Sequence, residues 1–330
     1  MALAFLLDCR WYALAAMMTT KPRIVTLEEH YLDAEVESYF ALPSGAFSAK
    51  LKDFTTVRLA AMDAAGIDVQ VLSHAPPGLQ GVDAASATSM ARRVNDRLYE
   101  VVQANPERFA GFASVPTTSP DAADELERAV TRLGFKGAMI HGLTDGLFID
   151  DKRFRPILER AEALDVPLYI HPADPHPAVT KAYFGDYART HPMFLRAAWG
   201  FTIETGTQAI RLVLSGAFDE FPRLQIILGH LGESIPFLLT RIDEALARDT
   251  PMKHFREYFS KHFYVTTSGF FSDAALLCCV QELGTDRILF SIDWPYASEA
   301  KGTEWLRRVH LSAADKRKLY HENAERLLKM

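Results

Sequence analysis

Eight short apolar runs alternate along the chain with stretches of helical periodicity, and this alternation constrains the fold more than any other feature. The runs cover residues 24–27, 69–73, 109–114, 137–140, 167–170, 224–228, 263–267 and 288–291. Runs that are short and mostly apolar are typical of parallel strands buried on both faces. Helical patterns lie between them, at residues 56–65, 88–105, 120–133, 151–164, 233–247, 272–282 and 298–309. The alternation predicts an α/β fold, a (β/α)₈ TIM-like barrel.

The length of 330 residues is greater than one simple barrel needs. A barrel of this type takes about 250 residues and accepts insertions. The rival fold, a doubly wound sheet, would carry a glycine-rich turn after the first strand, and the sequence has none there. We therefore expect one barrel domain over residues 21–330, with residues 173–216 forming a helical insertion after strand five. Residues 1–20 are expected to be a poorly ordered leader, because Asp8 and Arg10 interrupt the apolar run that a signal peptide needs.

Charge and cysteine content limit the partners and the cellular environment expected for the chain. The chain has 36 Lys and Arg against 42 Asp and Glu, a net charge of −6. Nucleic-acid and membrane-surface binders need a basic face, so we expect neither partner. No stretch reaches the ~18 uninterrupted apolar residues of a membrane span. The three cysteines, Cys9, Cys278 and Cys279, cannot form a disulfide framework and suit a reduced, cytoplasmic protein.

Histidine and acidic residues follow most of the predicted strands. They are Glu28, Glu29 and His30 after strand one, His74 after strand two, His141 after strand four, His171 after strand five, His230 and Glu233 after strand six, and Asp293 after strand eight. The carboxyl ends of barrel strands meet at one mouth, where the chemistry of such folds collects. Imidazoles and carboxylates that converge there make a site for a divalent metal.

Alternation along strand one sorts its three polar residues. Glu28 and His30 are two positions apart and should point to the same face, whereas Glu29 should point toward the helix layer or a supporting partner. A ligand set of imidazole and carboxylate suits Zn²⁺ or Mn²⁺. The alternative is structural: Glu28 would then be a turn acid and Asp293 a helix cap.

Four strings of sequence give the chain a family resemblance: LEEH (residues 27–30), YIHP (169–172), GHLGE (229–233) and SIDWPY (291–296). They resemble the amidohydrolase-superfamily branch of metal-dependent, non-oxidative aromatic acid decarboxylases, which includes γ-resorcylate, 2,3-dihydroxybenzoate and 5-carboxyvanillate decarboxylases. The resemblance runs from about residue 23 to the C-terminus. It implies a small aromatic acid as substrate, one divalent ion, with Zn²⁺ expected ahead of Mn²⁺, and a homodimer or homotetramer.

The resemblance also implies roles for individual residues. Glu28, His30, His171 and Asp293 match metal ligands, and His230 with Glu233 matches an active-site histidine and its supporting acid. We expect Asp293 to be the proton donor. Arg241, Arg58 and His141 are the expected substrate-binding residues, although His141 stands where some members have asparagine. A surface salt bridge to Asp243 or Glu244 is an equally good interpretation of Arg241.

Two other functions fit parts of the pattern. A hydrolase or hydratase of the same superfamily would use the metal to activate water and Asp293 as general base, acting on a lactone, amide or enol acid. The Glu-x-His spacing of residues 28–30 favours decarboxylation, because the hydrolytic members typically carry His-x-His there. A barrel that only binds a ligand would not need intact metal-ligand candidates on three strands.

Overall fold

A computed structural model describes residues 21–248 and 254–330 of the chain. The predicted leader and Cys9 lie outside the described residues. The strands are β1 (Val25–Tyr31), β2 (Val69–His74), β3 (Phe109–Gly111), β4 (Ala113–Ser114), β5 (Ala138–His141), β6 (Leu168–His171), β7 (Ile226–Leu228), β8 (Phe263–Thr266) and β9 (Ile288–Leu289). Each overlaps one of the eight predicted runs, and residues 109–114 contain both β3 and β4. Strand β1 extends past its run to Tyr31, so Glu28, Glu29 and His30 lie within the strand and not after it.

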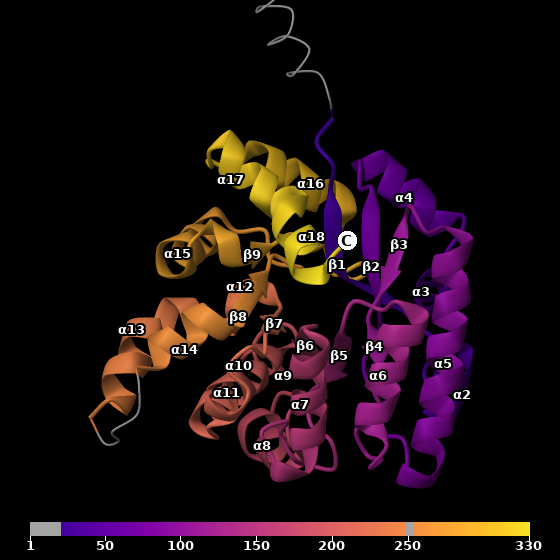
Figure 1. Cartoon of the computed structure of the whole chain (residues 1–330), viewed down its shortest axis with the longest axis horizontal. Helices are drawn as coiled ribbons and strands as arrows, with labels where there is room; N and C mark the ends of the chain where they lie inside the picture. The colour runs from indigo at the N-terminus through magenta and orange to yellow at the C-terminus, as the bar shows by residue number, and fades with distance from the viewer. Residues whose placement is uncertain (1–20, 249–253) are drawn as a thin grey trace, which may run out of the picture.

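Helices separate the strands along the chain and surround them in space (Figure 1). They are α2 (Ala34–Tyr39), α3 (Ala46–Lys52), α4 (Val57–Ala65), α5 (Ala84–Ala104), α6 (Ala122–Leu133), η1 (Lys152–Phe154), α7 (Arg155–Leu164), α8 (Pro177–Val179), η2 (Thr180–Phe184), α9 (Pro192–Leu195), α10 (Gly200–Leu214), α11 (Ala217–Glu220), α12 (His230–Glu233), α13 (Ile235–Leu246), α14 (Phe255–His262), α15 (Asp273–Leu283), η3 (Thr285–Arg287), α16 (Glu299–Arg308), α17 (Ala313–Arg317), η4 (Lys318–Glu322) and α18 (Asn323–Leu328).

All the strand pairs are parallel. One sheet has the order β1-β2-β3 and the other runs β4-β5-β6-β7-β8-β9. Phe112 joins the two sheets, because it lies between β3 and β4 and its backbone N–H donates to Leu72 O at 2.9 Å. A parallel bridge between Leu27 and Ser291 connects β1 to the segment after β9. The chain therefore forms the predicted (β/α)₈ TIM-like barrel.

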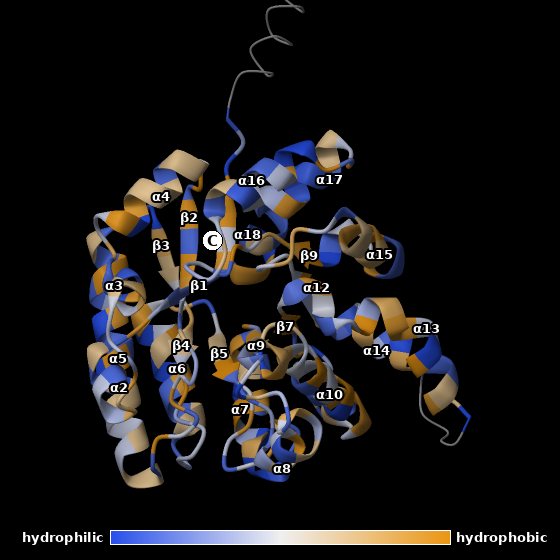
Figure 2. Cartoon of the chain, turned by 180° about the vertical axis from the view of Figure 1, so that it is seen from behind, coloured by the Kyte–Doolittle hydropathy of each residue, from blue (hydrophilic) through white to orange (hydrophobic). Residues whose placement is uncertain are grey.

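Apolar residues fill two layers. One lies inside the barrel and comprises Val25, Leu27, Val69, Val71, Ala110, Phe112, Met139, Tyr169, Ile227, Tyr264 and Leu289, together with Ala324 and Leu328 of α18. The other lies between the strands and the outer helices. Outer helices such as α5, α7 and α10 carry both apolar and polar residues (Figure 2), as helices packed on one face only must. Since α18 contributes to the inner layer, it closes the end of the barrel opposite the strands' carboxyl ends (Figure 1).

The insertion after the fifth barrel position is helical, as predicted. It follows β6 and contains α8, η2, α9 and α10. Several of its aromatic side chains are exposed, among them Tyr183, Tyr187 and Trp199. Within residues 21–248 and 254–330, no helix has the length and apolar character needed to cross a bilayer.

Candidate metal centre and active site

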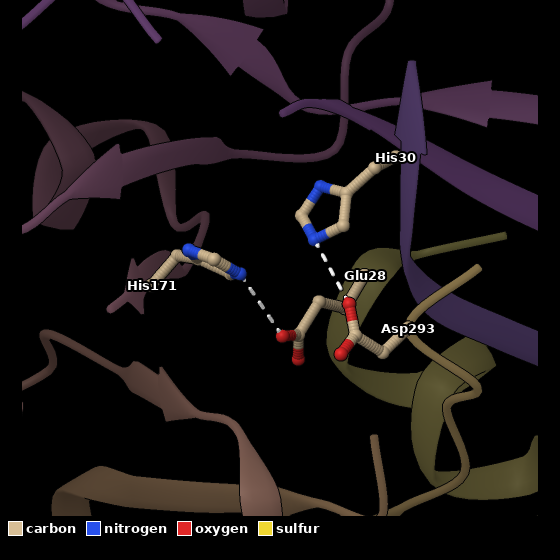
Figure 3. A group of neighbouring side chains, drawn as sticks. All are labelled: Glu28, His30, His171 and Asp293. Carbon is tan, nitrogen blue, oxygen red and sulfur yellow. Dashed lines mark ion pairs between the residues drawn. The ribbon is translucent and has the colours of Figure 1, made fainter. Parts of the chain in front are cut away.

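Four of the predicted site residues meet at the carboxyl ends of the strands. One ligand atom from each of Glu28, His30, His171 and Asp293 lies within 4.8 Å of the others. His30 Nε2 is 3.3 Å from Asp293 Oδ1, and His171 Nε2 is 3.3 Å from Glu28 Oε1 (Figure 3). Glu28 and His30 come from β1, His171 ends β6, and Asp293 follows β9. Three distant parts of the chain therefore converge on one point.

Glu28 reaches this point by a route that differs from simple strand alternation. The pairing of β1 with β2 shifts register between Thr26 and Glu29, and Glu28 has a φ of +58°. Such a bulge redirects a side chain locally. His230, Glu233 and Asp293 also have positive φ, at +50°, +53° and +71°. Non-glycine residues are uncommon in this region and concentrate at functional sites.

Hydrogen bonds hold one oxygen of Glu28 and leave the other without a partner. The hydroxyls of Tyr169 and Ser268 both donate to Oε2. Thr266 also approaches Oε2, at 3.4 Å, and its hydroxyl lies 2.8 Å from that of Tyr169. Oε1 is buried and accepts no hydrogen bond. Burial opposes ionisation of Glu28, but His230 and His171 outweigh it and lower the pKa well below the usual range.

The two histidine ligands are also oriented to leave a free nitrogen. His171 Nδ1 donates to the carbonyl of Pro172 at 2.6 Å, so its Nε2 carries a lone pair. His30 Nδ1 lies 3.4 Å from Ser73 Oγ, while its buried Nε2 has no hydrogen-bond partner. Unpartnered nitrogen and oxygen atoms facing one another match the donor set that a divalent ion takes. The residues therefore fit the predicted metal site.

His230 and Glu233 form a second unit beside these ligands. His230 Nδ1 is 2.7 Å from Glu233 Oε1. The other nitrogen, Nε2, lies 3.6 Å from Glu28 Oε1 and 3.8 Å from Asp293 Oδ2. Burial alone would lower the pKa of His230, but the charges of Glu233 and Glu28 raise it well above the usual value. His230 is therefore placed to hold a proton next to Asp293.

A buried polar network supports the ligands from behind. Glu29 Oε1 accepts the N–H of Ile292 at 3.0 Å, and Oε2 accepts that of Trp294 at 3.2 Å. These are the two amides that flank Asp293, so Glu29 supports the segment that carries Asp293, which was one of the two placements expected for it. Arg58 Nη2 donates to the carbonyl of His30 at 2.5 Å.

Arg58 lies behind the proposed metal ligands and not in the cavity wall. Its side chain is fully buried and its guanidinium lies 4.0 Å from the centre of the Trp294 ring. Nη1 donates to Gln70, which in turn donates to Glu299. Burial lowers the pKa of Arg58 to about 9 and raises that of Glu299 to about 7. Arg58 is absent from the cavity lining and supports the backbone of His30, so its predicted contact with substrate has no counterpart within this chain.

An open cavity of about 2170 Å³ lies above the ligands. His141, His171, His230, Glu233 and Asp293 contribute to its wall, together with the aromatic rings of Phe47 and Tyr296. Arg241 is exposed on α13 and is not part of the lining, so its predicted contact with substrate has no counterpart within this chain. Among the described residues, Arg196 is the arginine in the wall.

Comparison with known families agrees with this geometry. A family profile described as amidohydrolase matches residues 47–330. The chain belongs to the amidohydrolase family. Its relatives indicate the branch of the family to which it is most similar. This amidohydrolase is 40% identical over 325 residues to γ-resorcylate decarboxylase of Rhizobium sp. (strain MTP-10005), with 93% of this chain and 98% of the relative covered.

Two solved structures superpose on the amidohydrolase over nearly its whole length. One is 2,6-dihydroxybenzoate decarboxylase in complex with 2,6-dihydroxybenzoate, at 39% identity and a TM-score of 0.87, covering 94% of this chain and 100% of the other. Another is a dihydroxybenzoic acid decarboxylase from Polaromonas sp. JS666 with manganese and the inhibitor 2-nitroresorcinol, at 38% identity and a TM-score of 0.86, covering 94% and 97%. The predicted family resemblance is confirmed.

Sequence reasoning overlooked three contributors to the amidohydrolase site. Tyr169 lies two residues before His171 on β6, and that spacing could have placed it on the same side as the ligand. Ser268 lies two residues after β8, at the carboxyl end of a strand, and that position could have indicated it. Arg196, in contrast, comes from the insertion, where no periodic pattern relates it to the barrel mouth.

Proposed function

We propose that this amidohydrolase removes the carboxyl group of a 2,6-dihydroxybenzoate-type acid without an oxidant, releasing CO₂ and the dihydroxybenzene. The observation that carries the proposal is the convergence of Glu28, His30, His171 and Asp293 beside the His230–Glu233 pair. Relatives with these substrates in their names match the chain over nearly its full length, which supports the same class of reaction here. The protein is a carboxy-lyase of the amidohydrolase superfamily.

Direct loss of CO₂ from an aromatic ring would leave a carbanion in the ring plane, which is costly. Protonation of the carbon that bears the carboxylate avoids this. Asp293 supplies the proton, a C–H bond forms, and the ring loses its aromaticity. The C–C bond then breaks, its electron pair returns to the ring, and CO₂ leaves. An ortho hydroxyl favours the first step, because it increases the electron density on the carbon that takes the proton.

His230 assists the proton donor. Its Nε2 is 3.8 Å from Asp293 Oδ2, and Glu233 holds the opposite ring nitrogen. Glu233 therefore orients the imidazole, and His230 returns a proton to Asp293 after each turnover. In the cavity wall, Phe47 and Tyr296 offer apolar faces to the ring of the substrate, with 4.9 Å between their centroids.

Arg196 is the arginine of the cavity wall, and we assign it a hydrogen bond to the substrate anion. It forms a two-bond pair with Asp174, at 2.9 and 3.1 Å. We assign Arg196 this role within the chain and keep Arg241 as a predicted substrate contact.

Glu28, His30, His171 and Asp293 would hold one divalent ion. When bound, the ion supplies positive charge for the carboxylate and phenolate oxygens of the substrate. The sequence places Zn²⁺ ahead of Mn²⁺, but manganese in the solved Polaromonas relative supports Mn²⁺ as the first ion to test. A homodimer or homotetramer in the cytoplasm completes the proposal, and light scattering measures the assembly.

Product analysis tests the reaction. The metal-loaded protein is incubated with 2,6-dihydroxybenzoate in D₂O. We expect CO₂ and a dihydroxybenzene with one deuterium at the carbon that lost the carboxylate. Consumption of water by a lactone, amide or enol acid, with no CO₂ from any hydroxybenzoate, would establish the hydrolase or hydratase alternative instead.

A further inference from the structure

The side chain of Gln80 has a defined orientation, because it bonds to two backbone groups of opposite kinds. Its Nε2 donates to the carbonyl of Val115 at 3.3 Å, and its Oε1 accepts the backbone N–H of His141 at 3.3 Å. A carbonyl can only accept and an N–H can only donate. Turning the amide around would place donor against donor and acceptor against acceptor, so the oxygen of Gln80 must face His141.

This orientation fixes the tautomer of the His141 imidazole. Gln80 Oε1 lies 3.2 Å from His141 Nδ1. Because that oxygen is an acceptor, Nδ1 carries the ring hydrogen. The His141 side chain is buried, and burial disfavours a charged imidazolium, in keeping with a neutral ring. In a neutral imidazole protonated at Nδ1, Nε2 is a lone-pair acceptor.

The Nε2 atom of His141 has no partner in the described protein. It is buried, and His141 lines the cavity with its ring centroid 5.0 Å from that of His171. His74, at the end of β2, is a useful contrast. Its Nδ1 donates to Ala75 O at 2.7 Å and its Nε2 accepts the N–H of Asp33 at 3.1 Å. Both ring nitrogens of His74 form hydrogen bonds with main-chain groups, whereas Nε2 of His141 is an acceptor without a hydrogen-bond partner in the described protein.

The backbone around this pair is shaped to receive it. Gly78 has a φ of +60°. A Cβ at this position would lie 2.4 Å from His141 Nδ1 and 2.6 Å from Gln80 Oε1. Only glycine allows the imidazole and the amide to approach so closely. The backbone at Gly78 therefore accommodates the Gln80–His141 pair in the cavity wall. The same packing holds the imidazole in the orientation that leaves Nε2 without a partner.

We propose that His141 Nε2 accepts a hydrogen bond from a protonated ring hydroxyl of the substrate and thereby selects acids that carry a second hydroxyl. The inference rests on the proposed function, since it concerns how the protein recognises the proposed substrate. A carboxylate or an ionised phenolate offers no hydrogen to a lone pair, so the partner is a neutral phenol O–H. When an acid that lacks this hydroxyl binds, the buried acceptor stays without a hydrogen bond. The binding affinity for that acid is therefore much lower.

Equilibrium binding of non-reacting analogues tests the inference without turnover. The probes are 2-nitroresorcinol and 2-nitrophenol, which differ by one hydroxyl, titrated into the Mn²⁺-loaded protein. We expect the wild type to prefer 2-nitroresorcinol by about tenfold or more. His141→Leu should abolish the preference by weakening 2-nitroresorcinol alone, while His141→Gln, which retains an acceptor, should keep most of it. His141→Phe serves if the leucine variant does not fold.

His74→Leu is the matched control. It removes a buried histidine at the carboxyl end of another strand, β2, and we expect the preference to be unchanged, whatever its effect on stability. Manganese content is measured for each variant. A preference that survives in His141→Leu, an equal loss for both probes, or loss of manganese on removing His141 would each overturn the inference. Failure to release CO₂ from 2,6-dihydroxybenzoate would instead refute the proposed function. The binding comparison does not depend on turnover and would still test the role of His141.

Discussion

The hydroxyl of Tyr169 donates a hydrogen bond to Oε2 of Glu28, joining residues 141 positions apart in the sequence. Ser268 bonds to the same oxygen. The carboxylate is thus turned so that Oε1 faces His171 at 3.3 Å. The orientation of one proposed metal ligand therefore depends on a tyrosine from inside the barrel.

Tyr169→Phe should weaken metal binding. The substitution removes one of the donors that orient Glu28 while keeping the ring in the barrel interior. Loss of such a supporting hydrogen bond typically costs about 10- to 100-fold in metal affinity. Titration of the metal-free protein with Mn²⁺ measures the change. Tyr264→Phe is the control, since that ring lies in the same interior layer and stacks on Arg287. Equal affinities in the two variants would contradict the orienting role.

Asp293→Asn should abolish release of CO₂, because the amide cannot donate the proton that the ring carbon needs. General acid catalysis contributes about 10²–10⁴-fold, so we expect at least a 100-fold fall in kcat. The turnover assay is paired with circular dichroism and thermal melting to verify the fold. Near-normal turnover in this variant would remove Asp293 from the mechanism.

Chelation of the metal should stop the reaction and lower the melting temperature. Glu28 and Asp293 would then face each other's charge without a cation between them, and a ligand that binds the folded state stabilises it. Activity and melting temperature are measured before chelation, after it, and after return of Mn²⁺ or Zn²⁺ separately. Full activity in protein shown by elemental analysis to be metal-free would refute the metal requirement.

Arg196→Ala should raise KM for the aromatic acid by about tenfold, which corresponds to about 1.4 kcal/mol of lost attraction. The control is Arg211→Ala. Arg211 makes a comparable two-bond pair with Asp150, at 3.0 Å for each bond, but lies outside the cavity wall. Steady-state kinetics on both variants separate a local effect from loss of a surface ion pair. The same KM in both would exclude Arg196 from substrate binding.

Stability should fall at acid pH through Glu35. Its hydrogen bond to Arg93, opposed by burial and reinforced by Arg97, lowers its pKa from 4.5 to about 2. A lowered folded-state pKa stabilises the protein above pH 4.5, and this contribution disappears as the pH falls toward 2. The side chain is 31% exposed, so we expect about 1 kcal/mol.

Urea unfolding of wild type and Glu35→Gln checks this prediction. The variant should be less stable at pH 7 and equal to the wild type near pH 2. Glu304→Gln, at an exposed position on α16, should match the wild type at both pH values. A difference between wild type and Glu35→Gln that persists at pH 2 would show that the effect is not ionic.

The barrel could be predicted because each strand is a short apolar run and helical periodicity fills the stretches between the runs. Gly134 ends α6 in the left-handed conformation, which glycine adopts readily. The convergence of polar strand-end residues could be predicted because parallel strands bring their carboxyl ends together, and the family resemblance singled out four of them as proposed ligands. The bulge at Glu28 could not, since nothing in the LEEH string distinguishes it from a regular strand.

The arginines show where the reasoning stopped. The roles of Arg58 and Arg241 came from the family resemblance alone, but whether a long side chain enters a cavity depends on what packs around it. Arg58 is enclosed by Trp294 and the buried acids. Arg196 was missed because the insertion has no periodicity that relates it to the barrel. Side-chain partners between distant segments are a property of the packed structure.

The left-handed backbone at Glu28, His230, Glu233 and Asp293 affects how mutagenesis of this protein should be interpreted. Alanine disfavours positive φ by roughly 1–2 kcal/mol, whereas asparagine adopts it more readily. An alanine scan across these positions would therefore combine two effects, the loss of the functional group and an increase in backbone strain. Asp293→Asn removes the acid at little conformational cost, so substitutions matched to the local backbone report on chemistry alone.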